Sequence, residues 1–375
     1  MRVLYVINGF DPGGAEHGLV TLVESGAFDG HDLRILALCR GRGELADRIA
    51  RKLGEDVRFV TTGETLTLWA CVAGFFAVVR AALPFRPQKM VLSLKQANVV
   101  GRLAALLLPR VTCVAFEHIG EYRARRLQRI YGPLLRLLSA RVDEVWADCA
   151  ETLETTRRYF RPRRRAEHVI PLFVAEGQAP FKGDYVLGRP FRVAAAGRLV
   201  ARKNVPLMIE AVDALLGQGA DVTLDIYGDG PQKAALDRVI GGRAVQNRVR
   251  LHGYCADWPE QAAEAADIFL NMSDTEGFCI AVAEAMLTGL PVIAVETGGI
   301  RDYGRDGENM LKLTAPDAQA ASAAILRLAN DTSLRERLGR QARVDMLRDY
   351  DAAACRRQVA NALSSGRQTE AAEKT

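Results

Sequence analysis

Two glutamates with seven residues between them, Glu276 and Glu284, flank the predicted start of a helix. Glu276 falls in a loop after a strand expected at 268–271, and Glu284 falls inside a helix expected at 280–288. The residues around Glu284 are apolar, so its carboxylate needs a polar partner. The alternative, a helix cap at Glu276 and a solvated Glu284, fits that apolar run poorly. We expect both carboxylates to accept hydrogen bonds from hydroxyl groups of a ligand.

The helix start between the two glutamates is suited to an anion. Gly277 lets the backbone approach a ligand closely. The next three N–H groups point out of the first helical turn, where the helix dipole favours negative charge. They belong to Phe278, Cys279 and Ile280. A diphosphate bound there would leave both carboxylates free to accept hydrogen bonds from sugar hydroxyls.

Two cations, Arg198 and Lys203, follow a strand expected at 192–196 and would contact the same diphosphate. A nucleoside diphosphate gains negative charge as it leaves a sugar, so positioned cations stabilise the transition state more than the ground state. Arginine can bind phosphate with two parallel hydrogen bonds, whereas lysine acts as a point charge. The alternative is a pair of surface cations at a helix start.

The amino-terminal half adds a glycine-rich loop and a histidine. Gly13 and Gly14 end the loop that follows the first expected strand, at 3–7. This loop is not the dinucleotide fingerprint G-x-G-x-x-G. His118 follows another expected strand, at 112–116, and a lone histidine is more often structural than catalytic.

The spacing of Glu276 and Glu284 resembles the E-x7-E motif of the retaining glycosyltransferase family 4. The resemblance continues through residues 289–294 and 306–309, and residues 197–204 are similar to the family's G-R-x4-K-G element. Specific motifs cover most of 190–312, whereas weaker ones cover about 1–20 and 112–175. The resemblance implies the GT-B fold, in which two doubly wound Rossmann-like domains of α/β class face a central cleft.

The resemblance also assigns roles. The first glutamate of the motif contacts the donor sugar and the second binds the ribose hydroxyls, while His118 positions the donor sugar and Gly13 and Gly14 face the donor phosphates. Because no residue of the motifs is an obvious nucleophile, we expect front-side attack, in which a donor phosphate oxygen takes the acceptor proton. The cations and the helix start would replace a metal ion, so neither a metal nor another cofactor is expected.

The order of apolar runs and helical stretches predicts how these residues are held. Strands and helices alternate through both halves, which is typical of parallel sheets with right-handed crossovers. Residues 171–190 are rich in glycine and proline and predict a linker. We therefore expect an acceptor-side domain at 1–175 and a donor-binding domain at 176–351. A helix at about 352–366 is expected to pack back on the first domain.

Composition and charge limit the remaining choices. The chain has 375 residues, 49% hydrophobic and 25% charged, and its seven scattered cysteines predict neither disulfides nor a zinc site. No uncharged apolar stretch of about 20 residues predicts a spanning helix. Residues 66–79 come nearest to one, and predict either a half-buried helix or one that dips into lipid headgroups. A cytoplasmic protein is expected, with peripheral attachment to the inner face of the membrane as an alternative.

A basic segment could supply that attachment. Residues 123–141 contain six arginines and no acid, and Arg125, Arg129 and Arg136 share one helical face opposite leucines. Such a face could bind an anionic membrane surface and favours a lipid-linked acceptor. A solvated face is equally consistent with the sequence. Nucleic-acid binding is disfavoured because aromatic residues are sparse there.

We expect a transferase that moves a sugar from a UDP- or GDP-sugar to a glycan or lipid-linked acceptor in bacterial polysaccharide or glycolipid synthesis. Two alternatives remain open, a non-catalytic nucleotide-sugar-binding subunit and a sugar epimerase of the same fold. A phosphorylase is disfavoured because nothing in the sequence supports a pyridoxal phosphate lysine.

Overall fold

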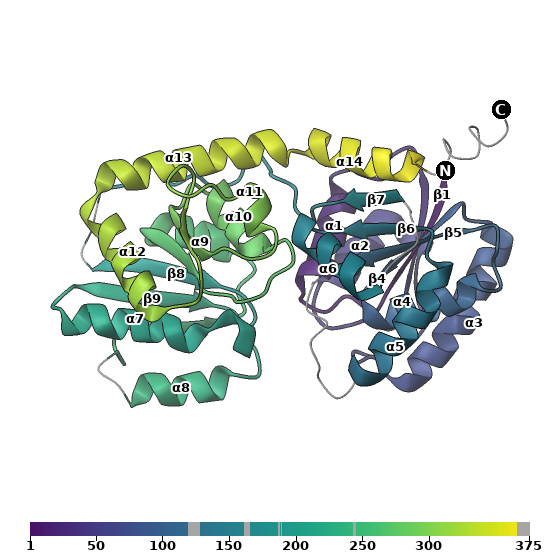
Figure 1. The fold of residues 1–375 in the computed structure, drawn as a ribbon, viewed down its shortest axis with the longest axis horizontal. Helices are drawn as coiled ribbons and strands as arrows, with labels where there is room; N and C mark the ends of the chain where they lie inside the picture. The colour runs from purple at the N-terminus through teal and green to yellow at the C-terminus, as the bar shows by residue number, and fades with distance from the viewer. Residues whose placement is uncertain (119–127, 161–165, 187, 189, 243–244, 366–375) are drawn as a thin grey trace. The chain divides into compact units, whose positions relative to one another are not determined.

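The computed structural model describes residues 1–118, 128–160, 166–186, 188, 190–242 and 245–365 (Figure 1). The chain divides into two compact units. Unit 1 comprises Met1–Val174 and the segment from Ala352 onward, and unit 2 comprises Ala175–Asp351. Each unit is built around its own parallel sheet.

The sheet of unit 1 has the strand order β3-β2-β1-β4-β5-β6-β7, and each pair of neighbouring strands is parallel. Its strands are β1 (Arg2–Ile7), β2 (Asp32–Ala37), β3 (Val57–Phe59), β4 (Lys89–Ser93), β5 (Thr112–Glu117), β6 (Glu144–Ala147) and β7 (Ala166–Val169). Its helices are α1 (Gly14–Glu24), α2 (Leu45–Leu53), α3 (Leu68–Phe85), α4 (Lys95–Ala105), α5 (Gln128–Leu138), α6 (Ala150–Phe160) and α14 (Ala352–Ser364).

Unit 2 repeats the plan with the order β10-β9-β8-β11-β12-β13. Its strands are β8 (Phe191–Ala196), β9 (Val222–Tyr227), β10 (Val249–Gly253), β11 (Ile268–Asn271), β12 (Val292–Val295) and β13 (Leu311–Leu313). Its helices are α7 (Val205–Gly217), α8 (Lys233–Gly241), α9 (Trp258–Ala265), α10 (Ile280–Leu287), α11 (Ile300–Tyr303), α12 (Ala318–Asn330) and α13 (Thr332–Asp349).

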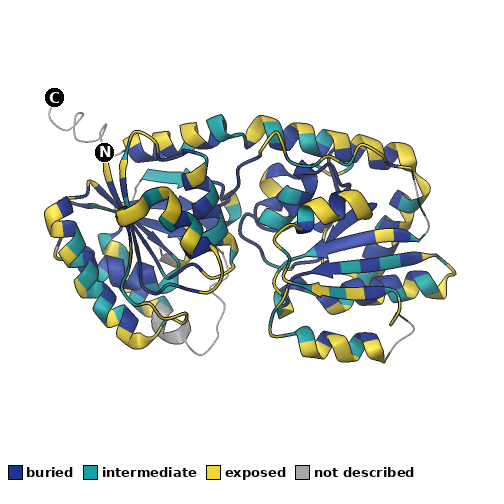
Figure 2. Cartoon of the chain, turned by 180° about the vertical axis from the view of Figure 1, so that it is seen from behind, coloured by how far each residue is buried: buried dark blue, intermediate teal, exposed yellow. Residues whose placement is uncertain are grey.

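Both sheets change direction beside their first strand, between β1 and β4 and between β8 and β11. In doubly wound sheets, ligands bind where the strand order reverses, at the carboxyl ends of the strands. The central strands are largely apolar because helices cover both faces. Figure 2 shows them buried, with exposed residues gathered on the outer sides of the helices. The predicted α/β class with two doubly wound parallel sheets is confirmed.

Helix α14 is held in unit 1 by a buried ion pair. Lys89 Nζ lies 2.7 Å from Glu144 Oε1 and donates to the carbonyl of Ala362 at 2.7 Å. Both charged side chains are at most 3% exposed. A lysine buried this deeply stays charged only with such partners, so the end of α14 completes the site that holds Lys89.

Helix α3 is longer than the sequence predicts. It begins at Leu68, where Thr67 Oγ1 accepts from the N–H of Ala70 at 3.1 Å, and it continues past Val79 to Phe85. Among the described helices, α3 is the one that passes a test of length and composition for a membrane span, with a mean hydropathy of 1.8 and 28% of its residues buried. The sequence analysis names the first part of this helix, within residues 66–79, as the segment nearest to a spanning helix.

Candidate functional site

The main cluster of candidate residues in unit 2 lies where β8 and β11 end. These strands are neighbours in the sheet, with Ile268 opposite Val193. The loop after β8 carries Arg198 and Lys203, and the loop after β11 carries Glu276. The predicted cation segment and the first predicted glutamate therefore meet at the point where the strand order reverses.

Lys203 and Glu276 form a buried ion pair. Lys203 Nζ lies 2.5 Å from Glu276 Oε1, and both side chains are largely shielded from solvent. Burial alone would raise the pKa of Glu276, but the charges of Lys203 and Arg202 outweigh it and hold that pKa below its usual range. Burial alone would lower the pKa of Lys203, and the carboxylate of Glu276 instead raises it. Both groups are charged at neutral pH.

Backbone and side-chain hydrogen bonds join the loop after β8 to the loop after β11. The N–H of Asp274 donates to the carbonyl of Arg202 at 3.0 Å, and Arg202 Nη1 donates to the carbonyl of Thr275 at 3.1 Å. Asn204 has φ 50° and ψ 37°, and its Nδ2 donates to the carbonyl of Met272 at 3.0 Å. Asparagine tolerates this left-handed conformation, which accounts for an asparagine where the resembling family commonly has glycine.

Helix α10 starts directly beside the ion pair. Its cap, Cys279, has φ 63°, and burial raises the pKa of its thiol. Residues in the first turn of a helix have no carbonyl four residues earlier within the helix, so the N–H groups of Ile280 and Ala281 face the loop. Phe278 packs against Tyr303 and Tyr350, with ring centroids 5.2 and 5.3 Å away. These contacts fix the direction of the α10 amino terminus.

Two glycines after β12, Gly298 and Gly299, contact the backbone of the loop that carries Glu276. The N–H of Gly299 donates to the carbonyl of Gly277 at 2.7 Å. Gly298 has φ +55°, and a Cβ there would lie 2.3 Å from the carbonyl oxygen of Gly277 and 2.5 Å from that of Glu276. The backbone of the 276–277 loop therefore depends on glycine at position 298.

We predict that Gly298→Ala lowers turnover by about 10- to 100-fold, because displacing positioning groups by about 1 Å costs rates of this order. The matched control is Gly307→Ala, where φ is +69° but nothing lies within 4 Å of the added Cβ. Both variants carry the strain of a left-handed backbone, about 1–2 kcal/mol. Urea unfolding should show a larger loss of stability in Gly298→Ala, whose Cβ meets backbone oxygens, and steady-state kinetics should show a rate defect in that variant alone. Equal rates would contradict the supporting role.

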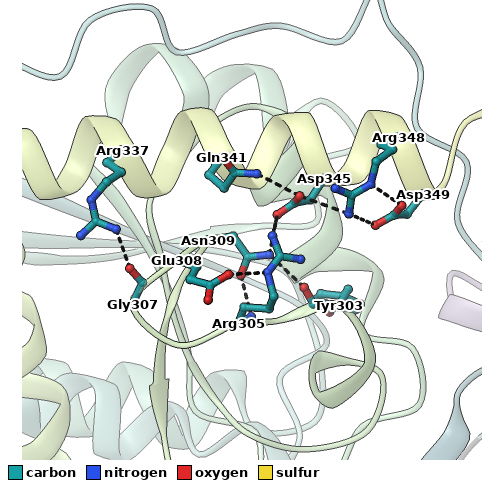
Figure 3. Close-up of polar contacts among 10 residues, drawn as sticks. All are labelled: Tyr303, Arg305, Gly307, Glu308, Asn309, Arg337, Gln341, Asp345, Arg348 and Asp349. Carbon is teal, nitrogen blue, oxygen red and sulfur yellow. Dashed lines mark hydrogen bonds and ion pairs between the residues drawn. The ribbon is translucent and has the colours of Figure 1, made fainter.

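A second network holds the segment that follows α11 (Figure 3). Asp345 on α13 is 1% exposed and lies 2.5 Å from Arg305 Nη2 and 2.9 Å from Asn309 Nδ2. Asn309 also donates to the carbonyl of Tyr303 at 3.0 Å. The hydroxyl of Tyr303 donates toward the carbonyls of Phe278 and Cys279, at 3.1 and 3.2 Å. Helix α13 is thus linked through Tyr303 to the start of α10.

Glu284 lies on α10, partly buried, and accepts a hydrogen bond from the indole of Trp258. Burial raises the pKa of its carboxyl group to about 8, with a smaller contribution from Glu260 and an opposing one from the Trp258 hydrogen bond. Trp258 continues into an aromatic group with Tyr227, and Tyr227 stacks on His252 with ring centroids 4.7 Å apart. Glu284 therefore holds a proton at neutral pH that a hydroxyl-donating ligand would displace.

In unit 1, His118 lies at the end of β5, next to the end of β4. Its Nε2 lies 2.7 Å from Ser93 Oγ. Burial lowers the pKa of His118 to about 3, so the imidazole is neutral. Its buried Nδ1 has no hydrogen-bond partner among the described residues. A neutral imidazole with one unsatisfied nitrogen is suited to a hydrogen bond with a ligand hydroxyl.

The predicted glycine loop of unit 1 follows β1. Gly13 caps α1, and Gly14 is its first residue. Asn8, at the start of the loop, donates to Gln96 Oε1 at 2.7 Å and accepts from the N–H of Ala97 at 2.8 Å. The loops after β1 and β4 are therefore joined where this sheet reverses.

The sequence does not predict several residues that contact the candidate site, and one predicted residue lies apart from the ion pair. Arg202, 3.6 Å from Glu276 Oε2, was not singled out, although its place beside Lys203 was a signal. Trp258 and Ser93 had no signal in the local sequence. Arg198 is exposed and makes no ion pair with any residue in the described ranges.

The basic segment is described only in part. Arg125 lies outside the described residues, and the side chain of Arg129 is not described. Arg136 is exposed near the end of α5, in which Leu135 and Leu138 are buried.

Three comparisons relate the chain to known proteins. A model of the family "Glycosyl transferases group 1" matches residues 185–345. The lipopolysaccharide core biosynthesis glycosyltransferase LpsE of Rhizobium meliloti is 35% identical over 146 residues, which are 39% of this chain and 42% of LpsE. Alpha-D-kanosaminyltransferase of Streptomyces kanamyceticus is 28% identical over 151 residues, 40% of this chain and 39% of that enzyme. These alignments span about two-fifths of the relatives' length.

The solved structure of HepE from Anabaena in complex with UDP-glucose is similar over 97% of this chain and all of that chain. The TM-score is 0.79 and the sequence identity is 22%, a likeness that shows the fold. Residues 185–345 therefore match the glycosyl transferases group 1 family, and the chain has the GT-B fold.

Proposed function

We propose that the chain is a retaining glycosyltransferase that moves a sugar from a UDP- or GDP-sugar to a glycan or lipid-linked acceptor in bacterial polysaccharide or glycolipid synthesis. The observation that carries this proposal is the buried pair of Lys203 and Glu276 beside the start of α10. It places a cation, a carboxylate and a helix amino terminus together at the reversal point of the sheet. The names of the relatives and the UDP-glucose bound to HepE support the same donor class.

The donor diphosphate binds at the amino terminus of α10, where Gly277 lets the backbone come close. Lys203 and exposed Arg198 offset the charge that grows on the leaving nucleotide. Glu276, whose pKa is held low, is ionised and can only accept hydrogen bonds, as sugar hydroxyls require. Glu284 receives the ribose hydroxyls, and Phe278, Cys279 and Ile280 contribute the backbone of the phosphate site.

In unit 1, neutral His118 binds a hydroxyl of the donor sugar through its unsatisfied Nδ1, and Gly13 and Gly14 present backbone to the donor phosphates. The acceptor oxygen attacks from the face that the nucleotide leaves. A donor phosphate oxygen takes the acceptor proton, so the configuration at the sugar carbon is retained. The protein's cations perform the charge stabilisation, and the proposal includes neither a metal nor another cofactor. The arginines Arg125, Arg129 and Arg136 are proposed to face an anionic membrane surface.

The test uses a panel of UDP-, GDP- and ADP-sugars with EDTA present. One donor should raise the melting temperature of the full chain and be hydrolysed slowly, with hydrolysis lost in Glu276→Gln. Product anomers resolved by NMR should retain the donor configuration. Stabilisation without hydrolysis or transfer to any glycan would favour a non-catalytic nucleotide-sugar-binding subunit, and no response to any donor would contradict the proposal.

A further inference from the structure

Helix α3 is apolar except at Arg80, but unit 1 buries only one of its faces. Ala70, Gly74, Val78, Ala82 and Phe85 are buried. Val78, Ala82 and Phe85 belong to the core that includes residues of β1, β2 and β4. Helices that are apolar all round normally lie inside a protein or a membrane. The opposite face of α3 is apolar but not buried by unit 1, which is unusual for a helix of a globular protein.

That other face carries large exposed apolar side chains. Leu68, Val72, Phe76 and Leu83 recur at intervals of four, four and seven residues, which puts them on one side of the helix. Trp69 lies at the edge of this stripe, and the exposed fractions are 80% for Leu68, 71% for Trp69 and 65% for Phe76. Contiguous exposed apolar surface of this kind marks an interaction site.

The charged residues of α3 and of the segment that follows it are positive. No aspartate or glutamate occurs from Thr65 to Phe116. Arg80, Arg86 and Arg110 in this region are exposed. Two other cations of the region are buried in ion pairs, Lys89 with Glu144 and Arg102 with Glu117. The exposed charge from α3 to Phe116 is therefore positive, whereas exposed Glu64 precedes the helix and Asp56 is paired with Arg34.

We propose that the exposed face of α3 docks unit 1 on an anionic lipid bilayer, with the apolar stripe in the headgroup region and Arg80 and Arg86 against lipid phosphates. Tryptophan and phenylalanine beside arginines are typical of segments that lie in the membrane interface. A second copy is a poorer occupant, because a two-fold contact through this face would bring Arg80 toward its own copy with no acid from this region to pair it.

The helix lies on the bilayer and does not cross it. Its inner face is committed to the sheet, and Gly74 approaches so closely that a Cβ there would lie 2.5 Å from Leu38 Cδ2. Insertion across the membrane would expose the core of unit 1, including the buried strands β1 and β4. The inference goes beyond the proposed reaction, since it needs neither donor nor acceptor.

Tryptophan fluorescence of the full chain tests the docking directly. The chain has three tryptophans, and Trp146 and Trp258 are 0% and 8% exposed, so Trp69 dominates any change on binding. Vesicles of equal parts phosphatidylcholine and phosphatidylglycerol should shift the emission to shorter wavelength, and brominated lipids should quench it. Unchanged emission with vesicles that bind the protein would overturn the assignment to α3.

Matched variants distinguish vesicle binding through this face of α3 from nonspecific hydrophobic binding. Trp69→Gln/Phe76→Gln should weaken co-sedimentation with the anionic vesicles at least tenfold. Leu326→Gln/Val344→Gln, which removes two exposed apolar side chains of unit 2, should leave it unchanged. Arg80→Gln should weaken binding about fivefold, since one cation near an anionic surface contributes about 1 kcal/mol. Equal binding by the first pair and wild type overturns the proposal, as does light scattering that shows a dimer dissociated by that pair.

Discussion

Replacing Lys203 by methionine is expected to lower kcat by about 10²- to 10³-fold, the usual cost of removing one group that stabilises transition-state charge. Lys203 Nζ is 2.5 Å from Glu276, at the start of the helix that is proposed to bind the diphosphate. The variant removes the cation and also frees Glu276 from its fixed position. Steady-state kinetics with the donor identified by the panel measure the effect. Lys233→Met, which breaks an exposed pair with Asp237, is the control and should retain wild-type kcat.

Lys203→Met is also expected to destabilise the chain. A second variant distinguishes this loss of stability from the loss of turnover. Removing one partner of a buried ion pair costs about 3–5 kcal/mol, because the other charge is left buried. Arg202, 3.6 Å from Glu276, moderates that cost. Lys203→Met/Glu276→Gln removes both charges and should recover most of the stability in urea unfolding. Its kcat should stay low. If the double variant regained turnover together with stability, neither Lys203 nor Glu276 would act on the donor.

The sequence predicts this pair only in part, for a physical reason. Alternating apolar runs locate β8 and β11, and parallel topology brings their carboxyl ends to one edge of the sheet. This suffices to put Lys203 and Glu276 near the same ligand. It does not predict that they bond to each other, because the path of each loop depends on Asn204 at φ 50° and Cys279 at φ 63°. Local spacing carries little information about such backbone turns.

The same limit applies to Glu284 and to α3. The apolar run around Glu284 indicates burial, but its partner Trp258 comes from a different helix, and only the packing of α9 on α10 brings the two together. For α3, periodicity identifies a helix but cannot distinguish its two apolar faces. The face that meets the sheet is decided by Gly74, whose missing side chain allows close packing against Leu38.

Binding of a nucleotide sugar at neutral pH is expected to release most of one proton from Glu284. The pKa of this carboxyl is about 8 in the folded chain, so the group is mostly protonated at pH 7. Two ribose hydroxyls donate best to an ionised carboxylate, and binding through them lowers the pKa. Calorimetric titration in two buffers of different ionisation enthalpy measures the released proton. Glu284→Gln should abolish the buffer dependence, whereas Glu260→Gln should preserve it. A buffer-independent enthalpy in the wild type would contradict the ribose role.

The raised pKa has a second consequence that is measured without ligand. The folded-state value, about 8, lies above the ordinary value of 4.5, so between these values the folded chain holds a proton that the unfolded chain has released. The free energy of unfolding contributed by Glu284 is therefore full below about pH 4.5 and falls as the pH rises toward 8. Glu284→Gln should flatten the pH dependence of urea unfolding in this window. A nucleotide sugar that binds the carboxylate should offset the loss at pH 8 more than at pH 6, since its affinity rises as Glu284 ionises. Ionisation of Glu284 at high pH thus lowers the stability of the ligand-free chain and raises its affinity for the nucleotide sugar.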